Sequence, residues 1–233
     1  MAGLLFILSA PSGSGKSTLV GQLRSMVQDL DFSVSWTTRA PRGSEEPGRE
    51  YHFTTREEFE RMIAANEFLE HADVFGNYYG TARSSLAEAA AHGRDLLLDI
   101  DVQGAAQVRQ KVPNAVTIFI LPPNPTVLAM RLTNRSRAEG GVPEEIVKKR
   151  LAMARQEIEN YRQYRYVLVN DVLERAVEEL TAIVAHERRM HQASPARTSD
   201  SDPEFQRSRL LADRCRLENS ADRLKLVLAS FDL

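Results

Sequence analysis

The chain has 233 residues, 42% of them hydrophobic and 27% charged, which is enough for one large globular domain but not for a second full one. Thirty basic residues against 32 acidic ones give a net charge of −2, which excludes an overall positive field that would attract nucleic acid or an anionic membrane. Since the sequence has neither a charged leader nor a run of about 18 apolar residues, we expect a cytoplasmic protein without a membrane partner. Its one cysteine, Cys215, predicts no internal disulfide, and the five scattered histidines predict no metal site.

Apolar runs of strand length alternate with amphipathic stretches along most of the chain. Buried strands that alternate with helices are typical of an α/β fold, in which helices cover both faces of a parallel sheet. The strand-like runs are residues 4–8, 68–74, 96–100, 115–120 and 166–169. The spacing of apolar residues predicts helices over residues 144–164, after Pro143, and over residues 173–191.

The sequence APSGSGKS after the first predicted strand matches the phosphate-loop pattern G-x-x-x-x-G-K-[ST] except at its first position. Two glycines would let successive backbone N–H groups converge on an anion, and the following helix would add its positive N-terminal dipole. The lysine would reach the β- and γ-phosphates, and the serine after it would bind Mg²⁺. The alternative is a turn with a solvated lysine, but the flanking strand and helix favour a phosphate loop. The predicted ATP-binding residues are Ala10, Pro11, Ser12, Gly13, Ser14, Gly15, Lys16, Ser17 and Thr18.

Two aspartates, Asp99 and Asp101, follow the apolar residues 96–98. Residues two apart on a strand point the same way, so we expect both carboxylates at the carboxyl end of a central strand. There they could hold a magnesium-bound water or accept hydrogen bonds from substrate N–H groups. The alternative is a capped strand end. With a phosphate loop in the same chain we favour a functional role, and Asp101 joins Ser17 as a candidate Mg²⁺ ligand, directly or through water.

The stretch SVSWTTRAPRGSEEPGREYHF, residues 33–53, carries Arg39 and Arg42 three positions apart and Tyr51 further on. The planar guanidinium of arginine matches the oxygens of a phosphate, and a tyrosine hydroxyl adds an uncharged donor. The stretch therefore predicts a second phosphate site, with a solvated basic loop as the alternative.

The next segment, EFLEHADVFGNYYGTAR, places Glu70 on a predicted strand and Tyr79 and Thr81 in a predicted turn. At this point the chain, from about residue 4 to residue 190, resembles the guanylate kinase family. The motifs that carry the resemblance are SVSWTTRAPRGSE, NYYGT, LLLDIDVQGA and YVLVND. The resemblance implies a P-loop NTPase fold, ATP and GMP as substrates, Mg²⁺ as cofactor, and a role in purine nucleotide metabolism.

The resemblance also implies a role for each matching residue. The GMP phosphate would be held by Arg39, Arg42, Tyr51 and Tyr79. The guanine would be contacted by Ser35, Glu70, Thr81 and Asp99. Catalysis would depend on Lys16, Arg39, Arg131, Arg135 and Arg150. The last three would belong to a lid at about residues 131–150, which contains Gly140 and Gly141. A GMP-binding subregion would span about residues 36–95. The core would consist of residues 1–35 and 96–191.

The chemistry of guanine suits these assignments. Guanine presents an N1–H and a 2-amino group side by side, whereas adenine has a lone pair at N1 and no 2-amino group. A carboxylate such as Glu70 would bind the first edge and repel the second, and the hydroxyls of Ser35 and Thr81 could donate to O6. We expect the wrong base to be rejected by a factor of about 10⁴ or more. Because the attacking phosphate oxygen is already ionised, no general base is expected.

The sequence departs from the family pattern in three places. Ala10 replaces the first glycine of the loop. The lid looks a few residues longer than in the family pattern, which affects the placement of Arg150. The chain from residue 192 has no counterpart in that pattern. Two other functions are considered. A ribose 1,5-bisphosphate kinase would share the loop but not the base-reading residues, and a non-catalytic, protein-binding guanylate-kinase-like module would be expected to lose the loop.

The last part of the chain differs in composition from the rest. Residues 192–207 are polar, contain proline and lack periodicity, which predicts a linker; a helical tail over residues 208–233 is predicted beyond it. Asp202-Pro203-Glu204 resembles a helix start. Four apolar residues recur every seven positions, namely Leu210, Leu217, Leu224 and Phe231. The tail could form a homo-oligomer, but with little more than three heptads we favour docking on its own domain, or fraying.

Overall fold

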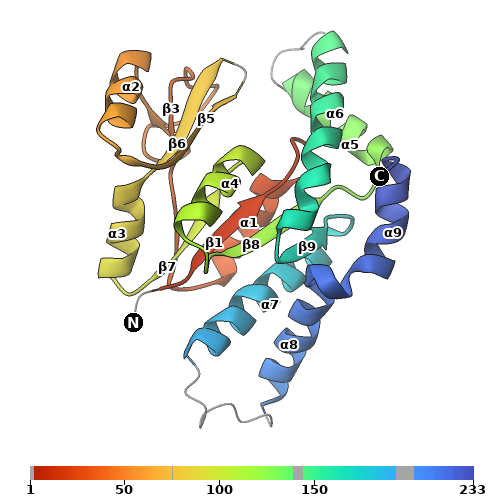
Figure 1. Ribbon diagram of the computed structural model, residues 1–233. Coiled ribbons are helices and arrows are strands. Elements are labelled where there is room, and N and C mark those ends of the chain that lie inside the picture. Colours follow the sequence, from red (N-terminus) through yellow and green to blue (C-terminus); the bar gives the residue numbers. More distant parts are fainter. Residues whose placement is uncertain (1–2, 75, 139–143, 193–201) are drawn as a thin grey trace. The chain divides into compact units, whose positions relative to one another are not determined.

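A computed structural model (Figure 1) describes residues 3–74, 76–138, 144–192 and 202–233. The chain divides into two compact units, Met1–Ile7 with Asp29–Ala115, and Leu8–Gln28 with Val116–Leu233. Our expectations for Pro143, for the lid glycines and for most of the linker fall outside the described residues.

The predicted strands form a five-stranded sheet, and strand β1 (Leu5–Ser9) belongs to both units. The strand order is β2-β7-β1-β8-β9. In the first unit, β2 (Leu30–Phe32) pairs in parallel with β7 (Asp95–Asp99). In the second unit, β8 (Val116–Leu121) pairs in parallel with β9 (Tyr166–Val169). Strands β1, β7, β8 and β9 are almost entirely buried, as expected for parallel strands between helices, so the predicted α/β fold is confirmed.

A second sheet, of four strands, lies within the first unit in the order β4-β3-β6-β5. Strand β6 (Asn77–Ala82) pairs antiparallel with both β3 (Trp36–Thr37) and β5 (Phe68–Val74), and β4 (His52–Phe53) pairs in parallel with β3. The assignment of residues 68–74 to the parallel sheet was therefore wrong. A short buried run does not reveal the direction in which its strand pairs.

The turn predicted at Tyr79 and Thr81 was also wrong, because both residues lie within β6. The glycine between them, Gly80, has a packing role instead. A Cβ atom at Gly80 would lie 2.9 Å from Cδ1 of Phe68 and 3.0 Å from Cζ of Phe59. Glycine within a strand often marks such a close approach.

Two of the described helices of the first unit have a polar side chain as N-cap. Thr55 caps the first of them by accepting a hydrogen bond of 3.2 Å from the backbone N–H of Glu58. Phe59 and Met62 of that helix pack with Phe68 into the core below the second sheet. The three helices are α2 (Arg56–Ala64), α3 (Arg83–Ala91) and α4 (Val102–Lys111).

The described helices of the second unit include both that the sequence predicts. The helix predicted over residues 144–164 ends at Ile158 and continues as a 3₁₀ helix, Glu159–Gln163. The helix predicted over residues 173–191 is confirmed and is one residue longer. The helices are α1 (Lys16–Met26), α5 (Pro125–Ala138), α6 (Glu144–Ile158), α7 (Leu173–Gln192), α8 (Pro203–Cys215) and α9 (Ala221–Ser230).

The tail packs on its own chain as two helices, with α8 against α7 (Figure 1). Asp202 caps α8 as predicted, and residues 203–207, predicted as linker, are helical. A 3₁₀ helix, Leu217–Asn219, interrupts the predicted heptads. Leu224 is buried on its own chain, whereas Leu210 is 63% exposed, so the four heptad residues do not form one stripe.

The single cysteine lies in this packed tail. Cys215 is fully buried, and burial raises the pKa of its thiol to about 12. An inert structural thiol fits both observations.

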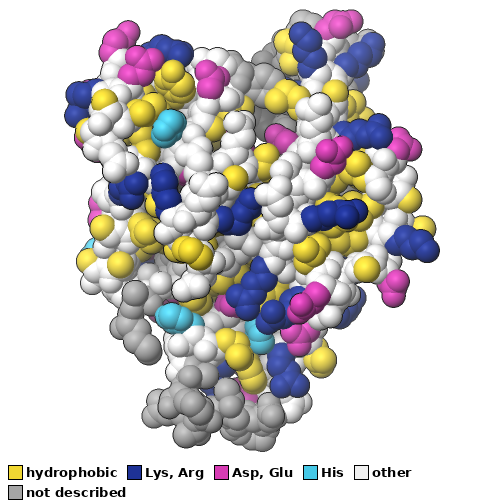
Figure 2. All heavy atoms as spheres, in the orientation of Figure 1, with side chains coloured by type: hydrophobic (Ala, Val, Ile, Leu, Met, Phe, Trp, Pro, Cys, Tyr) yellow, Lys and Arg dark blue, Asp and Glu magenta, His cyan; other side chains and the backbone are white. Residues whose placement is uncertain are grey.

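On the face shown in Figure 2, lysine and arginine side chains are dispersed among acidic and apolar ones. In the described part of the chain, no helix is both long and apolar enough to cross a membrane.

Candidate active site

The phosphate-loop sequence connects β1 to α1 within the second unit. Gly13 and Gly15 have φ angles of +88° and +85°, a left-handed conformation that side chains disfavour. Space is also short, since a Cβ atom at Gly13 would lie 2.9 Å from atoms of Leu128 and Leu132. Both glycines are therefore needed for the path of the loop, and the helix starts directly after them at Lys16.

Two side chains hold the loop from the same unit. The Ser14 carbonyl accepts hydrogen bonds from Nδ2 of Asn170, at 2.7 Å, and from Nη1 of Arg131, at 3.2 Å. Nη2 of Arg131 donates to the Asn170 carbonyl at 3.1 Å, which closes the network. These bonds turn one carbonyl of the loop toward the protein interior and fix the turn that precedes α1.

Asn170 was not assigned a role from the sequence. It follows β9 directly, is 4% exposed, and belongs to the YVLVND motif. A polar residue just after a buried strand is a signal that could have identified it, because ligand sites of parallel sheets form at the carboxyl ends of the strands.

The other loop and lid residues are placed as follows. Ser17 and Thr18 are exposed in the first turn of α1, which contains no acidic residue. Arg131 lies on α5 and Arg150 on α6. Arg135 lies on α5, but its side chain is outside the described part of the structure.

The second set of predicted residues comes together within the first unit, on the four-stranded sheet. Glu70 of β5 is directly opposite Thr81 of β6, and Thr37 of β3 is opposite Tyr79 of β6. Opposite residues share a face, and residues two apart on one strand do as well. One face therefore carries Glu70 and Thr81 at one point and Tyr79 about 7 Å further along β6.

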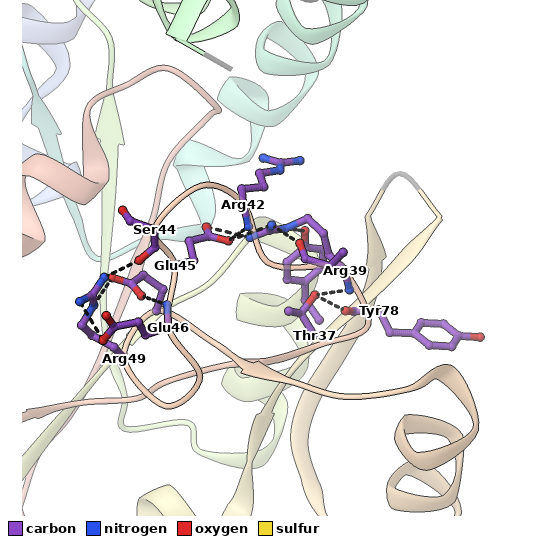
Figure 3. Close-up of polar contacts among 11 residues, drawn as sticks. Thr37, Arg39, Arg42, Ser44, Glu45, Glu46, Arg49 and Tyr78 are labelled. Atoms are coloured by element: carbon purple, nitrogen blue, oxygen red, sulfur yellow. Dashed lines mark hydrogen bonds and ion pairs between the residues drawn. The ribbon is translucent and has the colours of Figure 1, made fainter. Parts of the chain in front are cut away.

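Arg39 lies beside Tyr79 and is almost buried, with 8% exposure. Its Nε donates to the Tyr79 hydroxyl at 3.2 Å, and its Nη1 to the Ala40 carbonyl at 2.7 Å. Both terminal nitrogens bind Glu45, each at 3.0 Å, as Figure 3 shows. Such a two-point ion pair has the geometry in which a guanidinium binds a phosphate.

Glu45, which the sequence reasoning did not assign, also accepts a 2.8 Å hydrogen bond from the backbone N–H of Arg42. The Arg42 side chain points away from this ion pair (Figure 3). Tyr51 completes the group, because its ring packs edge-on against Tyr79 at 5.8 Å and lies 5.2 Å from the Arg39 guanidinium carbon. The predicted phosphate residues Arg39, Tyr51 and Tyr79 are therefore neighbours, with Arg42 attached through Glu45.

Glu70 is a buried carboxyl group, with 4% exposure. The pKa of Glu70 is raised to about 7, mainly by burial and also by the negative charge of Asp101, while a hydrogen bond from Thr81 and the charge of Lys111 act in the opposite direction. Near neutral pH the group is thus close to the balance between its neutral form and the carboxylate.

The sequence suggested that Asp99 and Asp101 lie on one strand, but the structure places only Asp99 there. Strand β7 ends at Asp99, and Asp101 is the N-cap of α4, where its Oδ1 accepts a 2.8 Å hydrogen bond from the backbone N–H of Gly104. Asp101 therefore caps a helix, and not a strand end as the alternative had it. Ser35 is partly buried in the segment before β3, where its carbonyl accepts from the backbone N–H of His52.

No group of three or more histidine, cysteine or acidic side chains that could hold a metal occurs among the residues that the structure describes. A metal bound with a nucleotide needs fewer protein ligands, because the phosphates supply the others. The exposed Ser17 hydroxyl suits that role, whereas one oxygen of Asp101 is already used by the helix cap.

The parallel sheet and the glycine-rich loop at a helix N-terminus define an α/β nucleotide-binding protein of the P-loop class. The family model described as guanylate kinase matches residues 3–187. The guanylate kinase of Koribacter versatilis is 53% identical over 232 residues, 99% of this chain and 97% of the relative. That of Neisseria meningitidis serogroup A is 53% identical over 182 residues, 78% of this chain and 87% of the relative.

A solved structure points to the same family. The crystal structure of guanylate kinase from Anaplasma phagocytophilum matches with a TM-score of 0.66 at 35% identity, covering 80% of this chain and 86% of that one. The chain belongs to the guanylate kinase family. Helices α8 and α9 lie beyond the matched family model, while the Koribacter relative aligns over almost the whole chain.

The loop anchor can be tested through stability. Asn170→Ala removes the shorter of the two bonds to the Ser14 carbonyl in a buried site, so we expect the free energy of unfolding in urea to fall by about 1–3 kcal/mol. Asn160→Ala is the matched control, because the hydrogen bonds described for its side chain, to the carbonyls of Gln156 and Glu157 and from the Gln163 amide, stay within its own helical segment. We expect a change within about 0.5 kcal/mol. Equal losses in the two variants would contradict the anchoring role.

The pair of Arg39 and Glu45 predicts a dependence on pH. The pKa of Glu45 lies below its ordinary value of 4.5, since the hydrogen bonds from Arg39 and the backbone of Arg42 outweigh its desolvation. Its stabilisation is therefore present above about pH 4.5 and is lost as the pH falls through the folded-state pKa. We expect Glu45→Gln to lower the free energy of unfolding by about 1–2 kcal/mol at neutral pH, a value reduced for the partial exposure of Glu45.

Urea denaturation from about pH 3 to pH 8 measures this difference. The gap between the wild type and Glu45→Gln should close in acid, whereas the exposed neighbour Glu46→Gln should show little gap at any pH. A gap of the same size throughout the range would mean that the ionised pair is not its cause.

Proposed function

We propose that this protein transfers the γ-phosphate of ATP to GMP, and to dGMP, giving ADP and the corresponding nucleoside diphosphate. One observation carries the proposal. The buried Glu70 carboxylate lies opposite Thr81 on the same sheet face as Tyr79, which binds Arg39. That face offers an acceptor group for a base and a cationic group for a phosphate, separated along one strand.

Guanine fits the acceptor end of this face. The ionised Glu70 would accept from the N1–H and the 2-amino group, and the hydroxyls of Thr81 and Ser35 would donate to O6. Asp99, the last residue of β7, would accept from the guanine edge as well. Adenine would leave the buried carboxylate without donors, which is the costliest outcome for a desolvated charge.

The GMP phosphate would bind at the cationic end, to Arg39, Arg42, Tyr51 and Tyr79. Arg39 already donates four of its five N–H groups to Ala40, Tyr79 and Glu45. The arriving phosphate would take over donors that Glu45 holds, since it offers the same two-point geometry with more charge. Arg42 would then close on the phosphate from the other side of the loop.

ATP would bind in the second unit, with its phosphates on the loop of residues 10–18 and on the N-terminus of α1. Lys16 would reach the transferred phosphate, and Arg131, Arg135 and Arg150 would neutralise the charge that develops there. Arg131 would act from a fixed position, because both of its terminal nitrogens are held by loop and strand carbonyls. No general base is required, because the nucleophile is an ionised phosphate oxygen.

Mg²⁺ would be held by the Ser17 hydroxyl and by the ATP phosphates, with Asp101 contributing through a water. When bound, the metal would neutralise charge on the β- and γ-phosphates. The exposure of Ser17 in the first turn of α1 supports it as the ligand. The cap bond from Gly104 limits Asp101 to an outer position.

We further propose the division into a core of residues 1–35 and 96–191, a GMP-binding subregion of about residues 36–95 and a lid of about residues 131–150. The protein would act in the cytoplasm, without a nucleic-acid or membrane partner. Formation of a homo-oligomer through the tail is the less favoured alternative, because α8 packs on α7 of the same chain.

A coupled assay of ADP release tests this function. With ATP and Mg²⁺, we expect turnover with GMP and dGMP, and none with AMP, UMP or ribose 1,5-bisphosphate. Lys16→Met should lower kcat by about 10²–10³-fold, because one preorganised positive charge is lost from the site of phosphoryl transfer.

The outcomes separate the alternatives. Turnover with the sugar bisphosphate alone would keep the loop and overturn the role of Glu70. Absence of turnover with every acceptor, from folded wild-type protein, would favour a protein-binding module. Unchanged turnover in Lys16→Met would contradict the role of that lysine.

A further inference from the structure

Helix α4 packs against strand β5 within the first unit, next to the buried Glu70. The contact is closest at Gly104. A Cβ atom built there would lie 2.3 Å from Oε2 of Glu70 and 2.9 Å from its Cδ. Ordinary contact of a carbon atom begins near 3.5 Å, so any side chain at this position would collide with the carboxyl group.

The backbone offers no other reason for a glycine at this position. Gly104 lies in the first turn of α4, and its φ angle is not in the positive range that favours glycine. Alanine is the better residue inside a helix, and glycine one of the worst. The missing side chain of Gly104 thus matters for the space that it leaves to Glu70.

Two more residues on the same face of α4 hold the backbone on either side of Glu70. Gln107 donates from Nε2 to the carbonyl of His71 at 2.6 Å and accepts from the N–H of His71 at 3.2 Å. Lys111 donates from Nζ to the carbonyl of Leu69 at 2.5 Å. The helix therefore binds the residues before and after Glu70 and leaves a gap for its side chain.

The spacing of these residues makes one helical face. Positions 104, 107 and 111 are three and four apart, so they lie above one another along α4. The contacts of Gln107 and Lys111 fix the backbone of β5 on either side of Glu70. Gly104 sets how closely the Glu70 carboxyl group can approach α4. A carboxylate that reads two adjacent donors must be held this closely, because a shift of about 1 Å breaks such contacts.

We propose that Gly104 is a specificity-determining position for the guanine base, and that Gln107 and Lys111 are positioning residues that hold the strand on either side of Glu70. The inference rests on the proposed function, in which Glu70 accepts hydrogen bonds from guanine. It adds that the selection of guanine depends on the absence of a side chain at Gly104, which leaves space for the Glu70 carboxyl group.

Gly104→Ala tests the inference. The added methyl group would displace the Glu70 carboxylate by about 1 Å, so we expect kcat/KM for GMP to fall by about 10²-fold. IMP, which lacks the 2-amino group, should be much less affected, because it makes fewer of the contacts that are lost. The ratio of kcat/KM for GMP to that for IMP should therefore fall by at least about tenfold, while KM for ATP stays the same.

Gly21→Ala is the matched control. Gly21 also lies inside a helix, but a Cβ atom there would meet no atom within 4 Å. Gly21→Ala replaces a helical glycine by the better helix former without any collision, so it should not lower the thermal midpoint of unfolding. The Gly21→Ala variant should keep the GMP to IMP ratio of the wild type.

Gln107→Leu keeps the volume of the side chain and removes both bonds to His71. We expect a smaller fall of the GMP to IMP ratio, again with KM for ATP unchanged. This variant covers the case in which Gly104→Ala fails to fold.

A folded Gly104→Ala protein with the GMP to IMP ratio of the wild type would overturn the inference, and so would an unchanged ratio in Gln107→Leu. Glu70→Gln separates that result from a failure of the proposed function. If Glu70→Gln lowers the ratio and the α4 variants do not, the role of α4 is wrong. If Glu70→Gln does not change the ratio either, Glu70 does not read the base.

Discussion

The arrangement of the first unit depends on one buried carboxyl group that has to find hydrogen-bond donors. Glu70 is 4% exposed, and its burial raises its pKa to about 7. A desolvated carboxylate is stable only where several N–H or O–H groups point at it. The sheet places Thr81 across from Glu70, and Gly104 leaves room for the carboxyl group; in the function proposed above, the two donors to Glu70 come from the ligand. In the proposed function, guanine, with two adjacent N–H donors, would complete the site.

The two proposed phosphate sites would bind an anion with different groups. The loop before α1 presents backbone N–H groups and a helix N-terminus, and its shape depends on the bonds that Asn170 and Arg131 make to one carbonyl. The site around Arg39 uses side chains instead, and Glu45 occupies the guanidinium where a phosphate would bind. An internal carboxylate keeps the cation in a binding geometry, and a dianionic phosphate can compete with it.

Much of the fold followed from local sequence patterns, because apolar runs and helical spacing record burial directly. The phosphate loop was recognisable for the same reason, since Gly13 and Gly15 need backbone angles that other residues avoid. The errors arose where contacts between residues far apart in the sequence determine how a segment pairs or packs. Residues 68–74 look like any buried strand, and Gly80 resembles a turn residue until the rings that fill its space are known. Asn170 and Glu45 act through partners far along the chain or through side-chain geometry, which a single sequence does not display.

The most direct test is a measurement of the ionisation of Glu70 by carbon-13 NMR, with the protein labelled at the glutamate carboxyl carbons. The signal is assigned by its absence from Glu70→Gln. We expect a midpoint at about pH 7 in the free protein. GMP should lower that midpoint, because its two N–H donors bind the ionised form, and AMP should not. A midpoint near the ordinary glutamate value of 4.5, unchanged by GMP, would contradict the claim that a buried carboxylate selects the base.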